Sequence, residues 1–501
     1  MNDTAAAVGP RERWLILGTA TFGTMLYAMA VTIASVALPD MRGAMAATQD
    51  QITWTITGNI VATAVATPLA GWFAGRTEAK PILFYSILGF ILSTLACGFA
   101  QNLEQLVVAR VAQGLFGAPL VPMAQAIVLA VFPQNQRSMS MAIWSMGAVL
   151  GPVVAPMLGG YLGEHLGWRW IFFMMVPFSC GALLAVWLFI PRLRLGEASP
   201  LDWTGFLALA IGIAALQIMF DRGERNSWFE SMETIIEACV AVLGLYIFVV
   251  HCLTAKRPFL DLSILKDRNY TVGLILVFLF GMLNFVPMVL FPPLLQELRG
   301  YPQSVIGLLM GTRGVGTFVA FLLMAFAGRI DPRIPMAIGF FLQGYAGWVM
   351  AGFSINLTTW GVAWTSCLQG FGVGLCWVPV SVVAFSTLSP KRIPEATALF
   401  QLLRNLASSA FISVSVAVVL HTGKVSYAET AGEVSVWVEG FKYLGLQQAW
   451  DIETLGGLAG LSNEIQRQSL MIGYLNAFKM FALTSFAAIP VILFLRLGKK
   501  A

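Results

Sequence analysis

The chain is poor in charge and in the residues that build catalytic and metal sites. Only 11% of its 501 residues are charged and only three are histidines, whereas a soluble domain carries about 25% charge. The histidines, His165, His251 and His421, are far apart, and no paired carboxylates, Ser/His/Asp set or phosphate-binding loop occurs. We therefore expect neither an enzyme nor a metal or cofactor site.

Cysteine is also scarce. The six cysteines form no CxxC pair, and most of them lie in apolar runs. We interpret them as small helix-packing residues rather than as disulfides or metal ligands. The net charge of +5 is spread over short loops, which excludes a basic patch for nucleic acid.

Hydrophobic sequence is what the chain has in excess. Hydrophobic residues make up 58% of it, and the mean hydropathy is +0.77. The apolar runs are long enough to cross about 30 Å of hydrocarbon as helices, which satisfy their own backbone groups in lipid. We predict an all-α polytopic membrane protein with fourteen spans. The predicted spans are 14–38, 52–74, 81–100, 105–131, 139–163, 169–190, 203–220, 234–253, 271–296, 303–327, 334–354, 359–387, 396–420 and 470–496.

The loops predict the orientation. About eighteen of the 30 basic residues lie at one set of alternate loops, which includes both ends of the chain. The positive-inside rule then places both termini in the cytoplasm. The long acidic loop at 421–469 faces outside, with residues 434–444 as a candidate surface helix. This loop either docks a partner or is simply solvated.

The chain also repeats itself weakly, after about 253 to 257 residues. The recurring motifs are Phe73-Ala74-Gly75-Arg76 with Phe326-Ala327-Gly328-Arg329, and Gln113-Gly114 with Gln369-Gly370. Parallel repeats are typical of two-halved secondary transporters. We therefore predict an N-terminal six-helix half at 1–195, an inserted transmembrane hairpin at 196–256 and a C-terminal six-helix half at 257–501.

A run of glycine and proline in the predicted fifth span carries a family resemblance. Its residues are Gly147, Gly151, Pro152, Pro156, Gly159 and Gly160. Helix propensity does not explain them, because Gly costs about 1 and Pro about 3 kcal/mol in a helix interior. The run resembles the antiporter motif of the major facilitator superfamily, specifically the 14-span drug:proton antiporters of the EmrB/QacA type. The resemblance implies a major-facilitator fold and a hinge that seals one side of the pathway. A tight helix crossing is the alternative.

A second motif in the predicted fourth span extends the resemblance. Arg110 with Gln113 and Gly114 is similar to the family motif whose arginine takes part in proton coupling. A charge inside a span is costly and usually functional. A snorkelling anchor near the span end is the alternative. Glu297 is the candidate carboxylate partner of Arg110.

A third motif follows the predicted second span. Gly71, Arg76 and Lys80 match the family's loop gate, but Gly75 stands where the family usually has Asp. The resemblance implies a gate at this loop. Without its acid, Arg76 could serve mainly as a topology signal.

The first span lacks an acid that the family usually carries. Drug exporters of this type usually have Asp where this chain has Ala30, and no acid lies in the middle of any predicted span. The remaining intramembrane charges include Arg313 and Arg404. Uncompensated cations repel cations and attract anions, so we predict a preference for neutral or anionic amphipaths. The alternative is that both arginines pair with carbonyls or a nearby acid and hold helices together.

We therefore predict a secondary active multidrug or amphipath exporter, with proton antiport implied by the resemblance. Its partners would be a small-molecule substrate, protons and membrane lipid. The resemblance also implies a periplasmic adaptor protein at the 421–469 loop. The alternative is a facilitator-fold carrier for a specific metabolite or a fatty or organic acid, which counterflow in inverted vesicles would distinguish.

Overall fold

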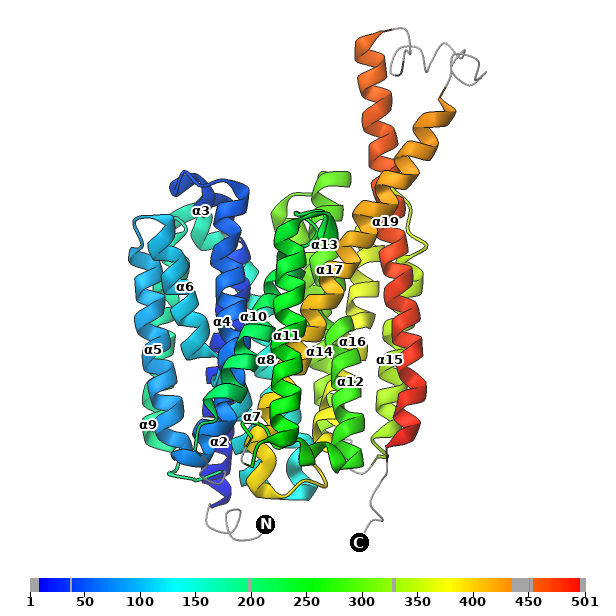
Figure 1. Ribbon diagram of the computed structural model, residues 1–501. Helices are drawn as coiled ribbons and strands as arrows, with labels where there is room; N and C mark the ends of the chain where they lie inside the picture. Colours follow the sequence, from blue (N-terminus) through cyan, green and yellow to red (C-terminus); the bar gives the residue numbers. More distant parts are fainter. Residues whose placement is uncertain are drawn as a thin grey trace.

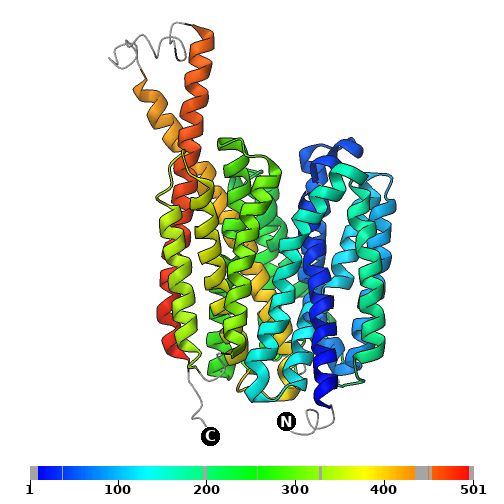
Figure 2. The same cartoon turned by 180° about the vertical axis from the view of Figure 1, so that it is seen from behind.

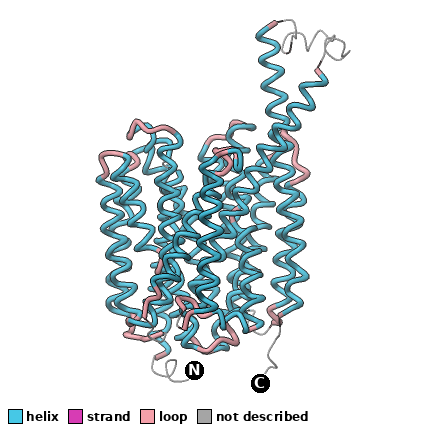
Figure 3. The backbone as a smooth tube through the Cα atoms, in the orientation of Figure 1, coloured by secondary structure: helices cyan, strands magenta, loops and turns pink. Residues whose placement is uncertain are grey.

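The computed structural model describes residues 9–36, 38–195, 200–256, 258–326, 330–434, 450 and 454–495. Every regular element within these residues is a helix (Figure 3). The first group comprises α2 (Pro10–Val36), α3 (Leu38–Ala44), α4 (Gln49–Arg76), α5 (Ala79–Phe99), α6 (Leu103–Gly117), α7 (Leu120–Val131), η1 (Gln134–Gln136), α8 (Arg137–Leu166) and α9 (Arg169–Phe189). The middle group comprises α10 (Trp203–Arg222), η2 (Trp228–Glu230), α11 (Met232–Thr254) and η3 (Leu262–Lys266). The last group comprises α12 (Arg268–Asn284), α13 (Val286–Pro293), η4 (Leu294–Leu298), α14 (Gln303–Phe326), α15 (Arg333–Met350), α16 (Thr359–Ala384), η5 (Pro390–Arg392), α17 (Ile393–Glu433), α19 (Leu455–Ala488) and η7 (Ile489–Phe494).

Polar caps in the loops fix where several long helices begin. Thr48 accepts a hydrogen bond from the backbone N–H of Gln51, whose side chain accepts one from the N–H of Thr48, so a capping box opens α4. Helices α6, α10, α12, α16 and α19 begin at a side chain that accepts from the N–H three residues later; these caps are Asn102, Asp202, Asp267, Thr358 and Thr454. The polar loop residues therefore set the helix starts, and the apolar runs between them supply the spans.

Two predicted spans are broken helices. Pro119 separates α6 from α7 within the span 105–131, because proline has no N–H to donate and crowds the preceding turn. The span 271–296 consists of α12, α13 with its three prolines, and the π-helix η4. Such breaks are tolerated at membrane depth where neighbouring helices satisfy the freed backbone groups.

Thirteen of the described helical segments are long and apolar enough to cross a membrane. They lie at thirteen of the fourteen predicted spans. The remaining span, 334–354, corresponds to the 18-residue helix α15, which packs against α16 and α19 in the bundle (Figure 1). The prediction of an all-α, multi-pass membrane protein is therefore confirmed.

In the chain, the hairpin α10–α11 lies between the first six and the last six spans. The early helices and the late helices form two neighbouring groups, the N-terminal and C-terminal halves (Figure 1 and Figure 2). Helix α8 of the N-terminal half packs on α14, and α4 and α7 pack on α17. The hairpin crosses itself at Gly212 and Gly244, where a Cβ on either glycine would lie 2.9 Å from backbone atoms of the other helix. We call the end where α2 begins and α19 ends the terminal end, and the opposite end the far end.

Helices α17 and α19 project past the other helices at the far end (Figure 1 and Figure 2). Helix α17 has 41 residues, which at about 1.5 Å per residue is about twice the thickness of the hydrocarbon layer. The Tyr427 hydroxyl lies 2.9 Å from Ser462 Oγ and ties the two helices together. The prediction of a loop at 421–469 was therefore wrong for its described parts, since hydropathy does not detect a polar helix paired with another. The predicted surface helix at 434–444 lies outside the described residues, apart from Val434.

Candidate transport pathway

Arg110 is enclosed within the N-terminal half, and among the described residues only neutral groups accept its hydrogen bonds. It is 1% exposed. Its Nε donates to the carbonyl of Thr55 at 3.1 Å, and its Nη1 to the carbonyl of Ala30 at 3.4 Å. It also donates to the side-chain oxygen of Gln113, which in turn donates to Thr94 Oγ1 at 2.8 Å. A snorkelling anchor would reach toward water, whereas Arg110 is held inside the bundle.

At Ala30, where the family usually carries an Asp, Arg110 finds a backbone carbonyl as its acceptor. Ala30 is buried, so an Asp side chain at this position would lie next to Arg110. Among the described residues, no acid forms an ion pair with Arg110. The candidate partner Glu297 is exposed on η4 in the other half and is not among the groups that Arg110 contacts.

Arg313 occupies a similar polar cradle in the C-terminal half. Its Nε donates to Gln369 Oε1 at 2.8 Å. Its Nη2 donates to both the carbonyl and the side-chain oxygen of Asn284, at 2.6 and 2.7 Å. Among the described residues, carbonyl and amide oxygens accept from Arg313 and no acid pairs with it. These contacts favour the alternative that Arg313 holds helices together.

The cradle of Arg110 forms where α4 crosses α6 at Gly114. A Cβ on Gly114 would lie 2.4 Å from the carbonyl oxygen of Asn59 and 3.1 Å from Thr63 Oγ1. The hydroxyl of Thr63 donates to the Gly114 carbonyl at 3.3 Å, and Asn59 donates to the Arg110 carbonyl at 2.8 Å. Only glycine fits such a close approach of two backbones.

The crossing of α14 and α16 at Gly370 has the same construction. A Cβ on Gly370 would lie 2.1 Å from the carbonyl oxygen of Arg313 and 2.9 Å from Thr317 Oγ1. The hydroxyl of Thr317 donates to the Gly370 carbonyl at 2.9 Å. Gly370 thus corresponds to Gly114, and Arg313 corresponds to Asn59.

The arginine therefore lies on a different helix in each half. In the N-terminal half it is Arg110 on α6, whose counterpart on α16 is Ser366, and in the C-terminal half it is Arg313 on α14. The predicted repeat of Gln113-Gly114 is thus also a repeat of geometry. The residues Ala327, Gly328 and Arg329 of the other predicted repeat lie outside the described residues.

Arg404 of α17 has fewer partners than the other two arginines. Its Nη2 donates to Asn405 Oδ1 at 3.0 Å, and its guanidinium carbon lies 5.2 Å from the centre of the Trp377 ring. Its Nε is buried without an acceptor among the described residues. Three residues before Arg404 on the same helix, Gln401 donates to Gln125 Oε1 of α7 at 2.7 Å. Arg404 therefore faces the interface between the halves.

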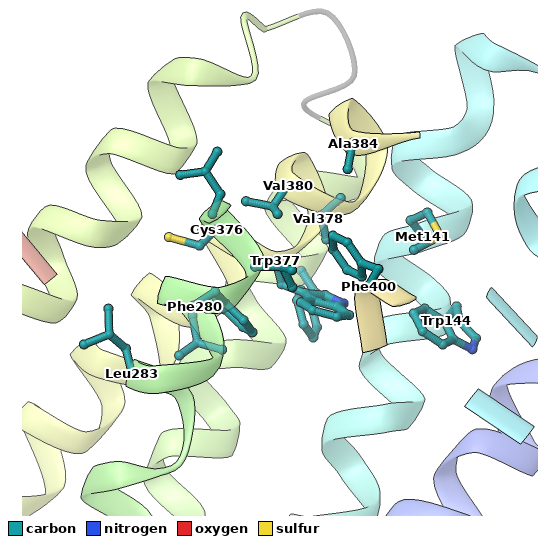
Figure 4. Close-up of a cluster of buried hydrophobic side chains, with 14 of the residues drawn as sticks. Met141, Trp144, Phe280, Leu283, Cys376, Trp377, Val378, Val380, Ala384 and Phe400 are labelled. Atoms are coloured by element: carbon teal, nitrogen blue, oxygen red, sulfur yellow. The ribbon is translucent and has the colours of Figure 1, made fainter. Parts of the chain in front are cut away.

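Trp377 of α16 lies in a buried aromatic cluster that crosses this interface. Its indole N–H donates to Ser145 Oγ of α8 at 2.8 Å. Its ring centre lies 5.1 Å from that of Phe280 and 5.9 Å from that of Phe400. Figure 4 shows Trp377 and Phe400 next to Trp144 of α8. Trp377 thus contacts Arg404 on one side and α8 of the other half on the other.

The antiporter-motif residues line the contact between α8 and α2. A Cβ on Gly147, Gly151 or Gly159 would lie 2.2 Å from Thr21 Cγ2, 2.5 Å from the Met25 carbonyl oxygen or 2.9 Å from Ile33 Cγ1. Pro152 is half-buried in the interior of α8. Pro156 and Gly160 continue the same helix, but their side-chain surroundings lie outside the described residues. The glycines permit a tight crossing; the hinge stays a prediction.

The predicted loop gate brings the two halves together at the terminal end. A Cβ on Gly71 would lie 2.9 Å from the Cα of Glu395 in the first turn of α17. Arg76 is exposed, with its guanidinium carbon 5.5 Å from the centre of the Trp72 ring. Lys80 is half-buried in the first turn of α5. Only the glycine of this motif contacts the opposite half directly in the described contacts.

At the far end, α10 lies between α4 and α17. Thr57 of α4 donates to the carboxylate of Asp221. On the other side, Gln217 donates to Ser409 Oγ at 2.5 Å, and Ser413 donates to the carbonyl of Phe220. Sequence analysis did not single out Asp221, and its contact with a polar residue of the second span was missed. No local sequence pattern marks this contact, because the two residues are far apart in the chain.

These features define a polytopic carrier of the two-halved secondary-transporter type. The sequence model of the Major Facilitator Superfamily matches residues 20–412. The chain is 32% identical over 418 residues to the multidrug export protein EmrB of Escherichia coli K12, covering 83% of this chain and 82% of that protein. It is 31% identical over 487 residues to the fatty acid resistance protein FarB of Neisseria gonorrhoeae, covering 95% and 94%.

A solved structure shows the same fold. The human organic anion transporter MFSD10 (TETRAN) aligns with a TM-score of 0.63 at 16% identity, covering 97% of this chain and 100% of that chain. The chain therefore belongs to the Major Facilitator Superfamily and, within it, to the EmrB-type drug efflux family. It is a membrane transporter.

Proposed function

We propose that the protein exports amphipathic small molecules in exchange for protons and prefers neutral or anionic substrates to lipophilic cations. One observation carries the preference: Arg110, Arg313 and Arg404 lie inside spans, and no described acid pairs with any of them. Fixed positive charge in a medium of low dielectric repels cations strongly. The names of EmrB and FarB support export of drugs and of fatty acids.

Export requires the two halves to expose the pathway alternately. The close contact of Gly71 with Glu395 supports a gate at the terminal end. The packing of α8 on α14 of the other half supports α8 as the element on which the halves turn. Helix α10, bonded to α4 and α17 at the far end, would have to exchange its partners during this motion.

We assign the binding of the exchanged proton to the carboxylate of Asp221. Its carboxylate is exposed at the far end, accepts a bond from Thr57 and lies near Arg222 and Arg225. Arg222 also pairs with Glu233 at 2.7 Å. Protonation would remove the negative charge that holds α10 to α4. In a variant Asp221→Asn, substrate would still equilibrate across the membrane but would no longer be driven uphill by a pH gradient; uphill transport at the parental rate would refute this role.

The orientation follows from the loops. The basic loops lie at the terminal end, so we assign this end to the cytoplasm of a bacterial inner membrane. Helices α17 and α19 would then project into the periplasm. Their paired, largely polar extension supports the docking of a periplasmic adaptor protein, which the resemblance implied.

The second candidate function is a carrier for a specific fatty or organic acid. The similarity to FarB over most of both chains favours it. It differs from a broad exporter in the range of its substrates, and counterflow in inverted vesicles would reveal an uptake direction.

A transport panel tests both functions. The protein is expressed in a host that lacks its own pumps and is challenged with cationic, neutral and weakly acidic amphipaths, with and without a protonophore. We expect resistance to neutral and acidic compounds that the protonophore abolishes. Strong resistance to ethidium-like cations alone would refute the preference, and resistance to one acid alone would favour the specific carrier.

A further inference from the structure

We infer that Arg404 is the receptor for the anionic group of the substrate, whereas Arg110 and Arg313 hold helix crossings together. The inference rests on the proposed transport of amphipaths and narrows it to one site. The ligand class is an amphipathic carboxylate, with its charged group at Arg404 and its apolar body on the aromatic cluster around Trp377.

The hydrogen bonds of the three arginines support this division. A guanidinium carries five N–H donors. Arg110 and Arg313 each direct Nε and a terminal nitrogen at fixed acceptors of their own half. Arg404 directs one terminal nitrogen at Asn405, and its buried Nε has no acceptor among the described residues. An unpaired buried donor is unfavourable, and a carboxylate would satisfy it with a charge-assisted bond.

The position of Arg404 suits a substrate site. It lies eleven residues after Ile393, the first residue of α17, or about 16 Å along the helix, close to the middle of a bilayer. Three residues earlier on the same helix, Gln401 donates to Gln125 Oε1 of the N-terminal half at 2.7 Å. A ligand at Arg404 would therefore contact both halves, as alternating access requires.

The adjoining aromatic cluster suits the apolar part of an amphipath. The ring of Trp377 has Arg404 over it, Phe280 beside it and a hydrogen bond to Ser145 of the opposite half. A lipophilic cation would have to compete with the guanidinium for this ring. A carboxylate would instead find a positive charge and an apolar wall side by side.

Two matched ligands test the site directly. The full-length protein in lipid nanodiscs is titrated with 1-naphthaleneacetate and with its neutral amide, which has almost the same shape. We expect the parental protein to bind the carboxylate more tightly. Arg404→Gln should weaken carboxylate binding by about tenfold to a hundredfold and leave amide binding within about twofold. Arg404→Lys, which keeps the charge but loses the planar fork, should show an intermediate loss.

The control is Arg313→Gln, whose expected defect is in the yield and thermal stability of the protein rather than in the ratio of the two affinities. Equal affinities for carboxylate and amide in the parental protein would overturn the inference, as would an unchanged ratio in a folded Arg404→Gln. A ratio lost in Arg313→Gln but kept in Arg404→Gln would also overturn it. Export is scored separately in cells, so a failure of the proposed function would be recognised even where the binding result stands.

Discussion

The crossing of α4 with α6 and the crossing of α14 with α16 are two versions of one construction. In both, a threonine hydroxyl donates to the carbonyl of a glycine that packs against the backbone of the opposite helix. The arginine, however, belongs to α6 in one half and to α14 in the other. The comparison teaches that backbone packing determines where the glycines lie, whereas the surrounding hydrogen-bond acceptors determine where each arginine lies.

The largest effect should come from filling the glycine positions. In Gly370→Ala the new Cβ would fall 2.1 Å from the Arg313 carbonyl oxygen, and a backbone group cannot move aside as a side chain can. We expect a loss of stability of about 3 kcal/mol or more, and slightly less for Gly114→Ala, where the distance is 2.4 Å. The measurement is the apparent midpoint of thermal unfolding in detergent.

The control for this prediction is Gly311→Ala on α14, where nothing lies within 4 Å of the added Cβ. Because alanine favours a helix over glycine by about 0.5–1 kcal/mol, this variant should unfold at the parental temperature or above. Equal midpoints for Gly370→Ala and Gly311→Ala would show that the crossing is looser than the geometry implies.

Removing an arginine should have the next largest effect. Arg110→Ala leaves Gln113 without its buried donor, and Arg313→Ala does the same to Gln369 and Asn284. Each unsatisfied buried group costs about 1–3 kcal/mol, so we expect transport to fall about tenfold to a hundredfold in both variants. The measurement is initial uptake into inverted vesicles, normalised to the total amount of expressed protein, so that a loss of folded transporter is counted. Full transport by Arg110→Ala would remove the coupling role that the resemblance gave this residue.

A relocated arginine would sharpen the comparison. Arg110→Ser combined with Asn59→Arg gives the N-terminal crossing the arrangement of the C-terminal one. If the surrounding acceptors determine where an arginine is needed, the double variant should transport about tenfold faster than Arg110→Ser alone, which corresponds to about 1.4 kcal/mol. Transport no better than that of the single variant would mean that the arginine must lie on α6 for a reason beyond satisfying its neighbours.

Much of this arrangement could be predicted from the sequence, because burial in lipid leaves a strong signal in composition. The apolar runs gave the spans, and the Gln113-Gly114 repeat gave two equivalent crossings. The equivalence of Asn59 with Arg313 could not be predicted, since the two residues share no chemistry and only the backbone contact relates them. The far extensions of α17 and α19 were missed because their residues are polar.

The site itself was predicted only in part. An arginine inside a span was recognisable as costly, which singled out Arg110, Arg313 and Arg404. Their different roles depend on acceptors contributed by distant helices, such as the Ala30 carbonyl at Arg110. The contact between Thr57 and Asp221 likewise joins residues far apart in the chain, and no local pattern marks it.

Placing the family's usual Asp at position 30 should change the rate of transport less than the selectivity between cations and weak acids. In Ala30→Asp a carboxylate would enter the surroundings of Arg110 and offset its charge. We expect resistance to lipophilic cations to rise by about tenfold relative to weak acids, which is about 1.4 kcal/mol. Dose–response curves for a matched cation and weak acid measure this ratio. An unchanged ratio in a well-expressed variant would show that the absence of this acid does not determine the substrate preference.

The smallest effect is expected at Ser366, the counterpart of Arg110. Its hydroxyl oxygen is buried without a hydrogen-bond partner among the described residues. In Ser366→Ala this unsatisfied group is removed and little volume is lost, so we expect stability to stay within about 0.5 kcal/mol of the parental value or to rise slightly. Thermal unfolding and vesicle transport measure both consequences. A large loss of transport would show that transport depends on Ser366 in the C-terminal half as it does on Arg110 in the N-terminal half. The two positions would then have equivalent functions although their hydrogen bonds differ.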